Sequence, residues 1–309
     1  MLILEMILVV MGLCLFEAIS SIDNAIINGD VLSTMSARAR KWFLLWGILI
    51  AVFVIRGLLP FAILWANNPQ LSVVELFTAT ITSDEAAISA IEQSAPILLV
   101  GGGTFLIFLF FHWLFLEPKH YGLRGEKVIH ENGVWFFAVV SVLLTLIVWF
   151  SIQVNPFMAF GAVVGSTAFF ITHGFKENAA QMEKKMIEGE RKMSDISKLM
   201  YLEVIDATFS IDGVLGAFAF TFSIPLILIG NGIGAIVVRQ FTVKNIDNIK
   251  KYKYLKNGAM YSILSLGMIM TAEAFGMEIP SYVTPLVTFA IIGYFFYKSD
   301  RELKERAKR

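Results

Sequence analysis

The sequence has little of the chemistry that disulfide scaffolds, zinc enzymes and nucleotide-driven machines require. It contains one cysteine, Cys14, so no internal disulfide can form. The four histidines, His112, His120, His130 and His173, are scattered, and none belongs to an HExxH motif. A nucleophile elbow, a Walker lysine motif and a Rossmann fingerprint are also missing. We therefore expect neither an enzyme nor an ATP-driven pump, and we interpret His112 and His173 as helix-end or interface groups rather than ligands.

Charge is also scarce. Only 16% of the residues are charged, and 25 Lys and Arg balance 25 Asp and Glu, so the net charge gives no indication of a nucleic-acid partner. By contrast, 57% of the residues are hydrophobic and the mean hydropathy is +0.70, which exceeds the apolar share of an ordinary soluble domain. These values predict an integral membrane protein in contact with the lipid bilayer. We expect it in the plasma (inner) membrane.

Apolar segments of sufficient length recur along the whole chain. A transmembrane helix needs about 20 apolar residues. The predicted spans are residues 4–28, 42–64, 96–116, 134–154, 157–174, 199–222, 224–241, 258–275 and 280–297. The expected fold is an all-α, polytopic transmembrane helix bundle of about nine spans, which forms a single domain over residues 1–309.

Lys and Arg are confined to alternate connections between these spans. They occur in residues 29–41, 117–133, 175–198 and 242–257 and in the basic tail 298–309. The intervening connections, 65–95, 276–279 and those around residues 155 and 223, contain none. Since cytoplasmic loops carry the excess of Lys and Arg, the N-terminus is predicted outside and the C-terminus inside.

An acidic motif occurs twice within apolar segments. Residues 16–28 read FEAISSIDNAIIN, and residues 205–217 read IDATFSIDGVLGA. A gapless alignment pairs acid with acid and serine with serine: Glu17 with Asp206, Ser21 with Ser210, and Asp23 with Asp212. The first motif lies in the first span and the second in the sixth, so the two helices are predicted to cross the membrane in opposite directions. This arrangement is an inverted repeat.

A second pair of segments follows the motifs in the same order. Residues 47–56, GILIAVFVIR, and residues 230–239, GNGIGAIVVR, both open with glycine and close with arginine. We therefore divide the chain into repeat halves 1–174 and 199–297, joined by the charged loop 175–198. Inverted repeats bring equivalent segments together near the bilayer midplane, where such transporters hold their substrate.

Six acids lie within the predicted spans: Glu17, Asp23, Glu203, Asp206, Asp212 and Glu273. An ionised carboxylate costs about 2.5–3.5 kcal/mol at the centre of a membrane helix on insertion scales. Arg56 and Arg239 are the only interior basic residues in these spans, which are too few to neutralise all six acids. We expect a bound cation or protons to complete the charge. The structural alternative is that the acids pair with these arginines and join helices.

Helical geometry separates the acids of each motif. Asp23 and Asp212 follow their partner acids by six residues and so lie about 120° around the helix. Either each motif helix is wedged between two polar surfaces, or it unwinds at the Ser-Ile-Asp; we favour unwinding. Carboxylates, the amides of Asn24 and Asn231, and serine hydroxyls are hard oxygen ligands, which suit Mg²⁺, Ca²⁺ or Mn²⁺.

At these residues the sequence resembles the TerC family of integral membrane proteins, which is related to the LysE-type transporter superfamily. The first signature of that family, an acid followed by Ser-x-Asp-Asn, is similar to residues 17–24. The second, V-E-x-x-D-x-x-F-S-x-D, is matched by Glu203, Asp206, Phe209, Ser210 and Asp212. A third, Ser-Asn before an apolar run to Arg, is met at Asn231, with glycine in place of the serine. Residues 40–60 are closest to an uncharacterised branch of the family.

This resemblance implies a secondary transporter that exports a divalent cation, with Mn²⁺ favoured and Ca²⁺ as the alternative, and it implies no other cofactor. The implied ligands are Glu17, Asp23, Asn24, Asp206 and Asp212, with Glu203 and Asn231 as second candidates; the hydroxyls of Ser21 and Ser210 complete the candidate set.

Two rival interpretations remain open. In the first, the chain is a membrane scaffold or sensor in a metal- or tellurite-stress complex, with the loop 175–198 as its docking surface. In the other it transports a different solute, and its acids only relay protons.

Overall fold

The computed structural model describes residues 3–21, 31–32, 34–47, 50, 56–76, 85–187, 194–249 and 251–307. Some side chains inside helices, among them those of Arg56, Asp206 and Arg239, also lie outside the described part. Within the described residues every regular element is helical, and no strand occurs. The expected all-α class is therefore confirmed.

The helices follow the predicted order along the chain. Their bounds are α1 Ile3–Ser20, α3 Ala37–Trp42, the π-helix η1 Phe43–Gly47, α4 Arg56–Asn67, α6 Glu85–Leu116, α7 Glu126–Glu131, the 3₁₀ turn η3 Gly133–Trp135, α8 Phe136–Val154, α9 Pro156–Ile187, α10 Asp195–Ala217, α11 Ile224–Ile249, α12 Leu255–Ala274 and α13 Val283–Ala307.

Four helices of the described chain are long and apolar enough to cross a bilayer. They are Ile3–Ser20, Ile91–Leu116, Gly133–Val154 and Pro156–Asn178. Gly57–Asn67 and Ile224–Val238 are shorter apolar helices. The predicted span 42–64 comprises the end of α3, η1 and most of α4, and residues between η1 and α4 lie outside the described part.

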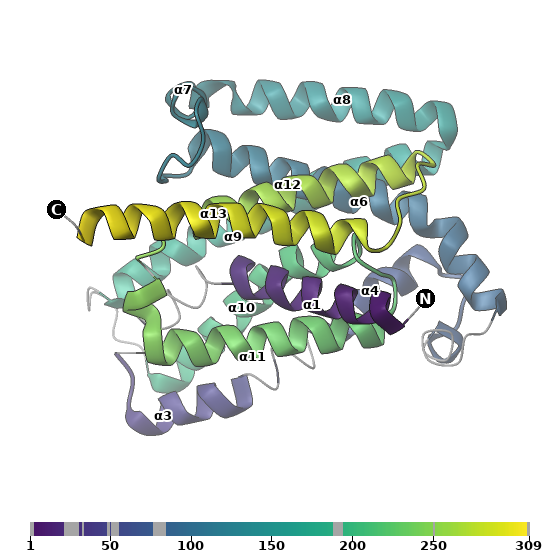
Figure 1. Ribbon diagram of the computed structural model, residues 1–309. Helices are drawn as coiled ribbons and strands as arrows, with labels where there is room; N and C mark the ends of the chain where they lie inside the picture. Colours follow the sequence, from purple (N-terminus) through teal and green to yellow (C-terminus); the bar gives the residue numbers. More distant parts are fainter. Residues whose placement is uncertain are drawn as a thin grey trace.

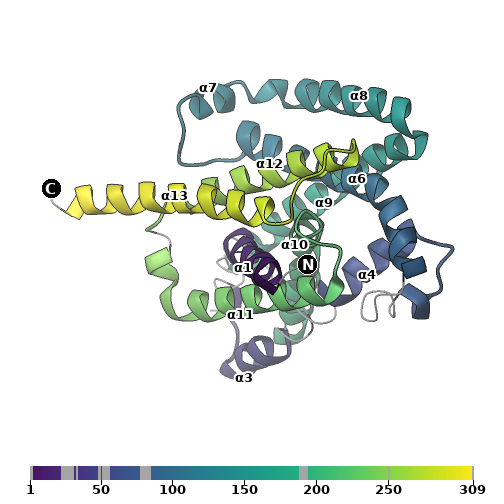
Figure 2. The same cartoon turned by 45° about the vertical axis from the view of Figure 1, so that its right-hand side comes forward.

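Burial separates a central helix from a peripheral one. In the apolar window of α6, 83% of the residues are buried, whereas in that of α8 only 11% are. Figures 1 and 2 show α8 as an outer layer, α6, α9, α12 and α13 beneath it, and α1, α10 and α11 on the far side. The exposed side chains of α8 include Leu146, Trp149 and Phe150. A continuous apolar surface of this kind is typical of a face that contacts lipid.

Several helices continue beyond the predicted spans. The span expected to end at residue 174 continues in α9 to Ile187, and the tail expected after residue 297 continues in α13 to Ala307. At about 1.5 Å per residue, the 32 residues of α9 extend roughly 48 Å, well beyond a hydrocarbon core of about 30 Å. Much of the charged loop 175–198 is therefore helix, and Lys176 is carried on a rigid element.

The tight turn at Asn155 has the chemistry that its sequence predicts. The backbone N–H of Phe157 donates a hydrogen bond to Asn155 Oδ1 over 2.9 Å. Pro156 occupies the first position of α9, where a backbone N–H would make no hydrogen bond within the helix, so its absence in proline costs nothing. The chain therefore reverses directly from α8 into α9.

Candidate functional site

The two motif helices, α1 and α10, pack against each other. The rings of Phe16 and Phe220 lie 6.0 Å apart. A Cβ added at Gly216 would lie 2.6 Å from the Phe16 ring, and one added at Gly12 would lie 2.8 Å from Phe220. Two acidic motifs that are far apart in the sequence thus meet in space.

Glu17 lies at the centre of this contact. Its side chain is buried, at 1% exposure, between α10 and α11. A Cβ added at Gly213 would lie 2.8 Å from Glu17 Oε2, and one added at Gly234 would lie 2.7 Å from Glu17 Cβ. The hydroxyl of Ser21 donates to Glu17 Oε1 over 2.5 Å. Glycine on both neighbouring helices therefore makes room for the carboxylate.

Asn231 is buried on α11 next to this glycine face. Gly230 and Gly234, four residues apart, approach the Leu13 and Cys14 backbone region of α1 closely, in the manner of small-xxx-small membrane contacts. Asn231 has no exposed surface, and neither its amide nitrogen nor its amide oxygen has a hydrogen-bond partner among the described residues. Such a group costs about 1–3 kcal/mol, which makes it a candidate ligand rather than a packing residue.

Asp212 pairs with a base that sequence reasoning placed elsewhere. Its Oδ2 lies 2.5 Å from Lys176 Nζ, and the two side chains are only 15% and 14% exposed. Its Oδ1 is buried without a hydrogen-bond partner within the described part of the chain. The expectation that Arg56 and Arg239 are the only interior bases is therefore wrong. The apolar run of α9 stops before Lys176, which is why the helix was expected to end there.

The second motif helix does not unwind. Helix α10 is continuous from Asp195 to Ala217, so the favoured break at Ser-Ile-Asp is wrong for this motif. Asp212 reaches α9, whereas the next residue, Gly213, faces Glu17 of α1. The helix is wedged between two polar surfaces, the alternative that helical geometry allowed. Asp23 and Asn24 of the first motif lie outside the described residues.

The remaining candidates lie at different places. Glu203 contacts η1, because a Cβ added at Gly47 would overlap Glu203 Oε1. Ser210 is buried on α10 at 2% exposure. The backbone of Asp206 belongs to α10, but its side chain is not described. The structure thus brings Glu17, Ser21 and the Asp212–Gly213 turn together and leaves Glu203 at a separate contact.

Comparison with known proteins identifies the family. The sequence profile of a family described as "Protein of unknown function (DUF475)" matches residues 22–306, which is most of the chain. The chain belongs to the DUF475 family. This agrees with the similarity of residues 40–60 to an uncharacterised branch, while the wider TerC resemblance stays an expectation.

A relative of this DUF475 protein is the "Uncharacterized membrane protein YceF" of Bacillus subtilis (strain 168). It is 26% identical over 191 residues, which cover 60% of this chain and 71% of the relative. No solved structure matches the chain. Together with the apolar helices, the relative indicates an integral membrane protein.

The DUF475 chain also contains a second buried carboxylate, which sequence analysis missed. Glu126 is 2% exposed and accepts hydrogen bonds from the backbone N–H of Gly122 at 2.7 Å and of Leu123 at 3.0 Å. The Asn257 amide at 3.1 Å and the Tyr261 hydroxyl at 3.0 Å also donate to it. Glu126 thereby fastens the α6–α7 connection to α12, which is a structural role.

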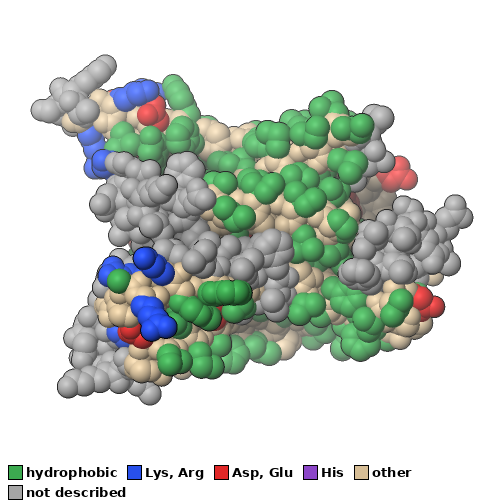
Figure 3. Space-filling model, turned by 90° about the horizontal axis from the view of Figure 1, so that it is seen from below, with side chains coloured by type: hydrophobic (Ala, Val, Ile, Leu, Met, Phe, Trp, Pro, Cys, Tyr) green, Lys and Arg blue, Asp and Glu red, His purple; other side chains and the backbone are tan. Residues whose placement is uncertain are grey.

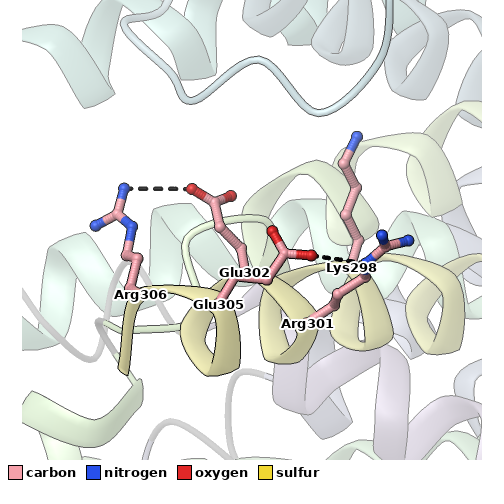
Figure 4. Close-up of a pocket in the computed structure, with 5 residues that line it drawn as sticks. All are labelled: Lys298, Arg301, Glu302, Glu305 and Arg306. Atoms are coloured by element: carbon pink, nitrogen blue, oxygen red, sulfur yellow. Dashed lines mark hydrogen bonds and ion pairs between the residues drawn. The ribbon is translucent and has the colours of Figure 1, made fainter. Parts of the chain in front are cut away.

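A charged hollow of about 530 Å³ lies beside the last turns of α13 (Figure 4). Its lining residues in the described part of the chain come from that one helix: Lys298, Arg301, Glu302, Glu305 and Arg306. Two ion pairs of i,i+4 spacing, Arg301–Glu305 at 3.0 Å and Arg306–Glu302 at 3.3 Å, join these side chains, and the half-buried Glu302 also pairs with Lys253. Exposed pairs of this kind contribute at most about 1 kcal/mol, and the hollow has the properties of a solvated helix face.

Proposed function

We propose that this DUF475 protein is a secondary transporter that exports a divalent metal cation, with Mn²⁺ favoured and Ca²⁺ as the alternative, through a carboxylate site between its two motif helices. The observation that carries the proposal is the contact of Glu17 with Gly213, the residue after Asp212. Near this contact Asp212 Oδ1 is buried and lacks a hydrogen-bond partner among the described residues. Buried carboxylate oxygens inside a membrane are the hard ligands that Mn²⁺, Mg²⁺ and Ca²⁺ take.

The direction of the motif helices supports an inverted repeat. Along α1, Gly12 approaches Phe220, Phe16 approaches Gly216, and Glu17 approaches Gly213. The residue numbers of these contacts rise along α1 while they fall along α10 and the turn after it, so the two helices are antiparallel. Two equivalent helices that cross a membrane in opposite directions are what an inverted duplication produces.

The contacts between the halves support the same duplication. The second segment of the second half packs on the first helix of the first half, where Gly234 of α11 meets Glu17 of α1. In exchange, Gly47 of η1 in the first half meets Glu203 of α10 in the second. A pseudo-two-fold axis between α1 and α10 accounts for both contacts. We include nine spans in this proposal, because a helix overlaps each predicted one.

The distribution of charge supports an external N-terminus and a cytoplasmic C-terminus. On the face drawn in Figure 3, Lys and Arg side chains gather at the left end with a few acidic ones among them, a broad hydrophobic zone follows, and only acidic charged side chains appear at the right end. The C-terminal end of α13 lies at the left in Figure 1, the end at which Figure 3 draws the basic side chains. The excess of basic residues is characteristic of the cytoplasmic side.

Lys176 gives the site a resting counter-ion. In the structure its ammonium forms an ion pair with Asp212 Oδ2, over 2.5 Å. We propose that an entering divalent cation displaces this ammonium, takes Asp212 and Glu17 as ligands, and is released when the ammonium returns. An exchange of one cation for another keeps the carboxylate neutralised at every stage, which a low-dielectric site requires.

Transport in reconstituted vesicles tests the proposal. Purified protein is reconstituted into proteoliposomes that contain a Mn²⁺-sensitive dye. The Mn²⁺ flux is then compared for wild type, Glu17→Gln and Asp212→Asn. Each substitution removes one ligand charge while it keeps the shape, so flux should fall at least tenfold. Glu273→Gln, on the half-buried Glu273 of α12, is the matched acidic control and should retain flux. Unchanged flux in both site variants would refute the proposed site.

A further inference from the structure

Two histidines from different helices lie side by side away from the carboxylate site. His112, near the end of α6, and His173, on α9, have ring centroids 3.7 Å apart. Glu177 follows His173 by one helical turn, and its Oε1 lies 3.4 Å from His173 Nε2. One ligand atom from each of these three residues lies within 4.8 Å of the others, a spacing that one metal ion can bridge.

The cluster has a carboxylate placed behind one of its histidines. Glu117 Oε1 lies 3.4 Å from His112 Nδ1, and Glu117 Oε2 is in turn held by Lys256 Nζ at 2.9 Å. Metal-binding histidines typically direct one ring nitrogen to a carboxylate and the other to the metal, and such partners orient the ring. Glu117 is thus placed within reach of His112 as such an orienting partner, although His112 Nδ1 makes no hydrogen bond in the described structure.

Packing fixes the inner side of the cluster, and its outer side is open. The ring of His173 stacks on Phe169, at 5.7 Å and an interplanar angle of 5°, and the ring of His112 meets Phe136 edge-on at 5.5 Å. Exposure rises outward, from 7% for His112 to 21% for His173 and 68% for Glu177. An ion can therefore enter from the Glu177 side and retain water ligands there.

We propose that His112, His173 and Glu177 form a binding site for a divalent transition-metal ion of the Zn²⁺ type. Two imidazole nitrogens and one carboxylate oxygen are a donor set that Zn²⁺, Co²⁺ and Ni²⁺ accept readily, with water in the remaining position. Such a set differs from the all-oxygen ligands of the transport site. The two histidines do lie at a helix interface, as expected from the sequence, and the new element is that this interface has the form of a ligand set.

The site shares one turn of α9 with the transport site. Lys176, which pairs with Asp212, lies between His173 and Glu177 in the sequence. This part of the inference rests on the proposed transport function: a divalent ion held by His173 and Glu177 places positive charge on the same helical turn as Lys176 and so disfavours the ammonium there. The histidine site is therefore placed to let a transition metal regulate the exchange of Lys176 for the transported cation.

Spectroscopy of Co²⁺ in the full-length protein tests the site. Metal-free protein in detergent is titrated with CoCl₂, and the visible absorption of nitrogen-coordinated Co²⁺ is recorded, followed by displacement with ZnCl₂. Wild type should bind one Co²⁺ with this spectrum and lose it to Zn²⁺. His173→Gln and Glu177→Gln should weaken binding more than tenfold, and Glu117→Gln by about 10–100-fold, the usual cost of losing an orienting partner.

Matched controls keep the test interpretable. His120→Gln removes an exposed histidine whose backbone carbonyl, rather than its ring, accepts a hydrogen bond from Asn257; it should bind Co²⁺ as wild type does. The exposed Glu177 can be changed without disturbing the core, so a loss of binding in Glu177→Gln cannot come from misfolding. A wild type without nitrogen-coordinated Co²⁺, or a His173→Gln variant with the full signal, would overturn the proposal.

The histidine site and the transport site can fail separately. Asp212→Asn should abolish Mn²⁺ flux and leave the Co²⁺ spectrum intact. His173→Gln should remove the spectrum and leave the basal Mn²⁺ flux of metal-stripped vesicles intact, while added Zn²⁺ should change the flux of wild type alone. If Zn²⁺ alters flux equally in wild type and His173→Gln, regulation through this cluster is excluded even where the ion binds.

Discussion

Two buried carboxylates of this protein have opposite surroundings. Glu126 accepts hydrogen bonds from two backbone N–H groups of the α6–α7 connection and from an amide and a hydroxyl of α12. Asp212 has one charged partner, Lys176, and a second oxygen without a hydrogen bond in the described structure. Among the described residues, the same fold thus supplies four hydrogen-bond donors to the carboxylate of Glu126 and only one charged partner to that of Asp212. Within the described structure, Asp212 Oδ1 lacks the hydrogen bonds that Glu126 has, and this contrast supports the proposal that a ligand binds at Asp212.

Removal of Glu126 should have the largest effect on stability. Glu126→Ala removes the acceptor of the Gly122 and Leu123 N–H groups and of the Tyr261 hydroxyl, and a hydrogen bond to a charged group contributes about 1.5–3 kcal/mol. We expect a loss of about 3 kcal/mol or more, measured by unfolding in detergent. Glu131→Ala, whose exposed carboxylate lies 3.7 Å from Lys127, should change stability by less than about 1 kcal/mol. Equal effects of the two would remove the contrast drawn above.

A methyl group at Gly213 should disable transport more than it destabilises the fold. The added Cβ lies 2.8 Å from Glu17 Oε2, so Gly213→Ala must displace the carboxylate. We expect Mn²⁺ flux to fall at least tenfold and stability to fall by about 1–3 kcal/mol, the usual cost of overpacking. At Gly293 on α13 the Cβ meets open space, so Gly293→Ala serves as control and should retain both properties. Normal flux in Gly213→Ala would show that Glu17 needs no fixed position.

Neutralisation of Lys176 should strengthen Mn²⁺ binding, whereas the substitutions at Glu17, Asp212 and Gly213 should impair transport. If the ammonium and the metal compete for Asp212, Lys176→Met removes the competitor, and Mn²⁺ should bind about tenfold more tightly, which corresponds to about 1.4 kcal/mol. Isothermal titration of purified protein measures the change, with Lys184→Met, an exposed lysine farther along α9, as control. Weaker binding in Lys176→Met would mean that the lysine supports the site instead of occupying it.

The smallest effect concerns Lys119 at the end of α6, close to Glu126. Its ammonium donates to the carbonyls of Trp113 and Leu114. Burial lowers the pKa of Lys119 to about 8, although Glu126 and Glu117 raise it. Since the unfolded chain keeps this proton up to its ordinary pKa of 10.5, stability should rise modestly between pH 8 and 10.5. Lys119→Met should lack this rise in a pH series of unfolding; a fall in wild type over the same range would contradict the lowered pKa.

Local pattern predicted the elements better than their ends. A helix overlaps each predicted span, because length and apolarity are properties of contiguous residues. The ends differ: residues 218–222 of the span 199–222 follow the end of α10, and α13 begins only at Val283. The end of α9 was placed too early, since the apolar run stops before Lys176 while the helix continues to Ile187. A helix that leaves the bilayer no longer needs apolar residues, so hydropathy gives no signal for where it ends.

The candidate site shows the same division. The duplicated acids singled out Glu17 and Asp212. Glu17 is buried against Gly213 and Asp212 pairs with Lys176, and their role as metal ligands stays a prediction. The partner of Asp212 was missed, and so was Glu126, because neither belongs to a repeat. The preference for an unwound second motif was also wrong, since glycine and lysine on the neighbouring helices accommodate both faces of α10 without a break.

The two acidic motifs thus remain the candidate site, but their neighbours in the structure differ from those expected from the sequence. By itself the sequence determined the membrane class, the all-helical fold and the pairing of two acidic segments, since composition, periodicity and repetition are read along the chain. Only the tertiary structure decided that Lys176 reaches Asp212, that Glu126 fastens α12, and that His112 meets His173. Those contacts depend on how each helix is rotated and shifted against its neighbours, and this is set by side-chain packing across the bundle rather than by any stretch of sequence.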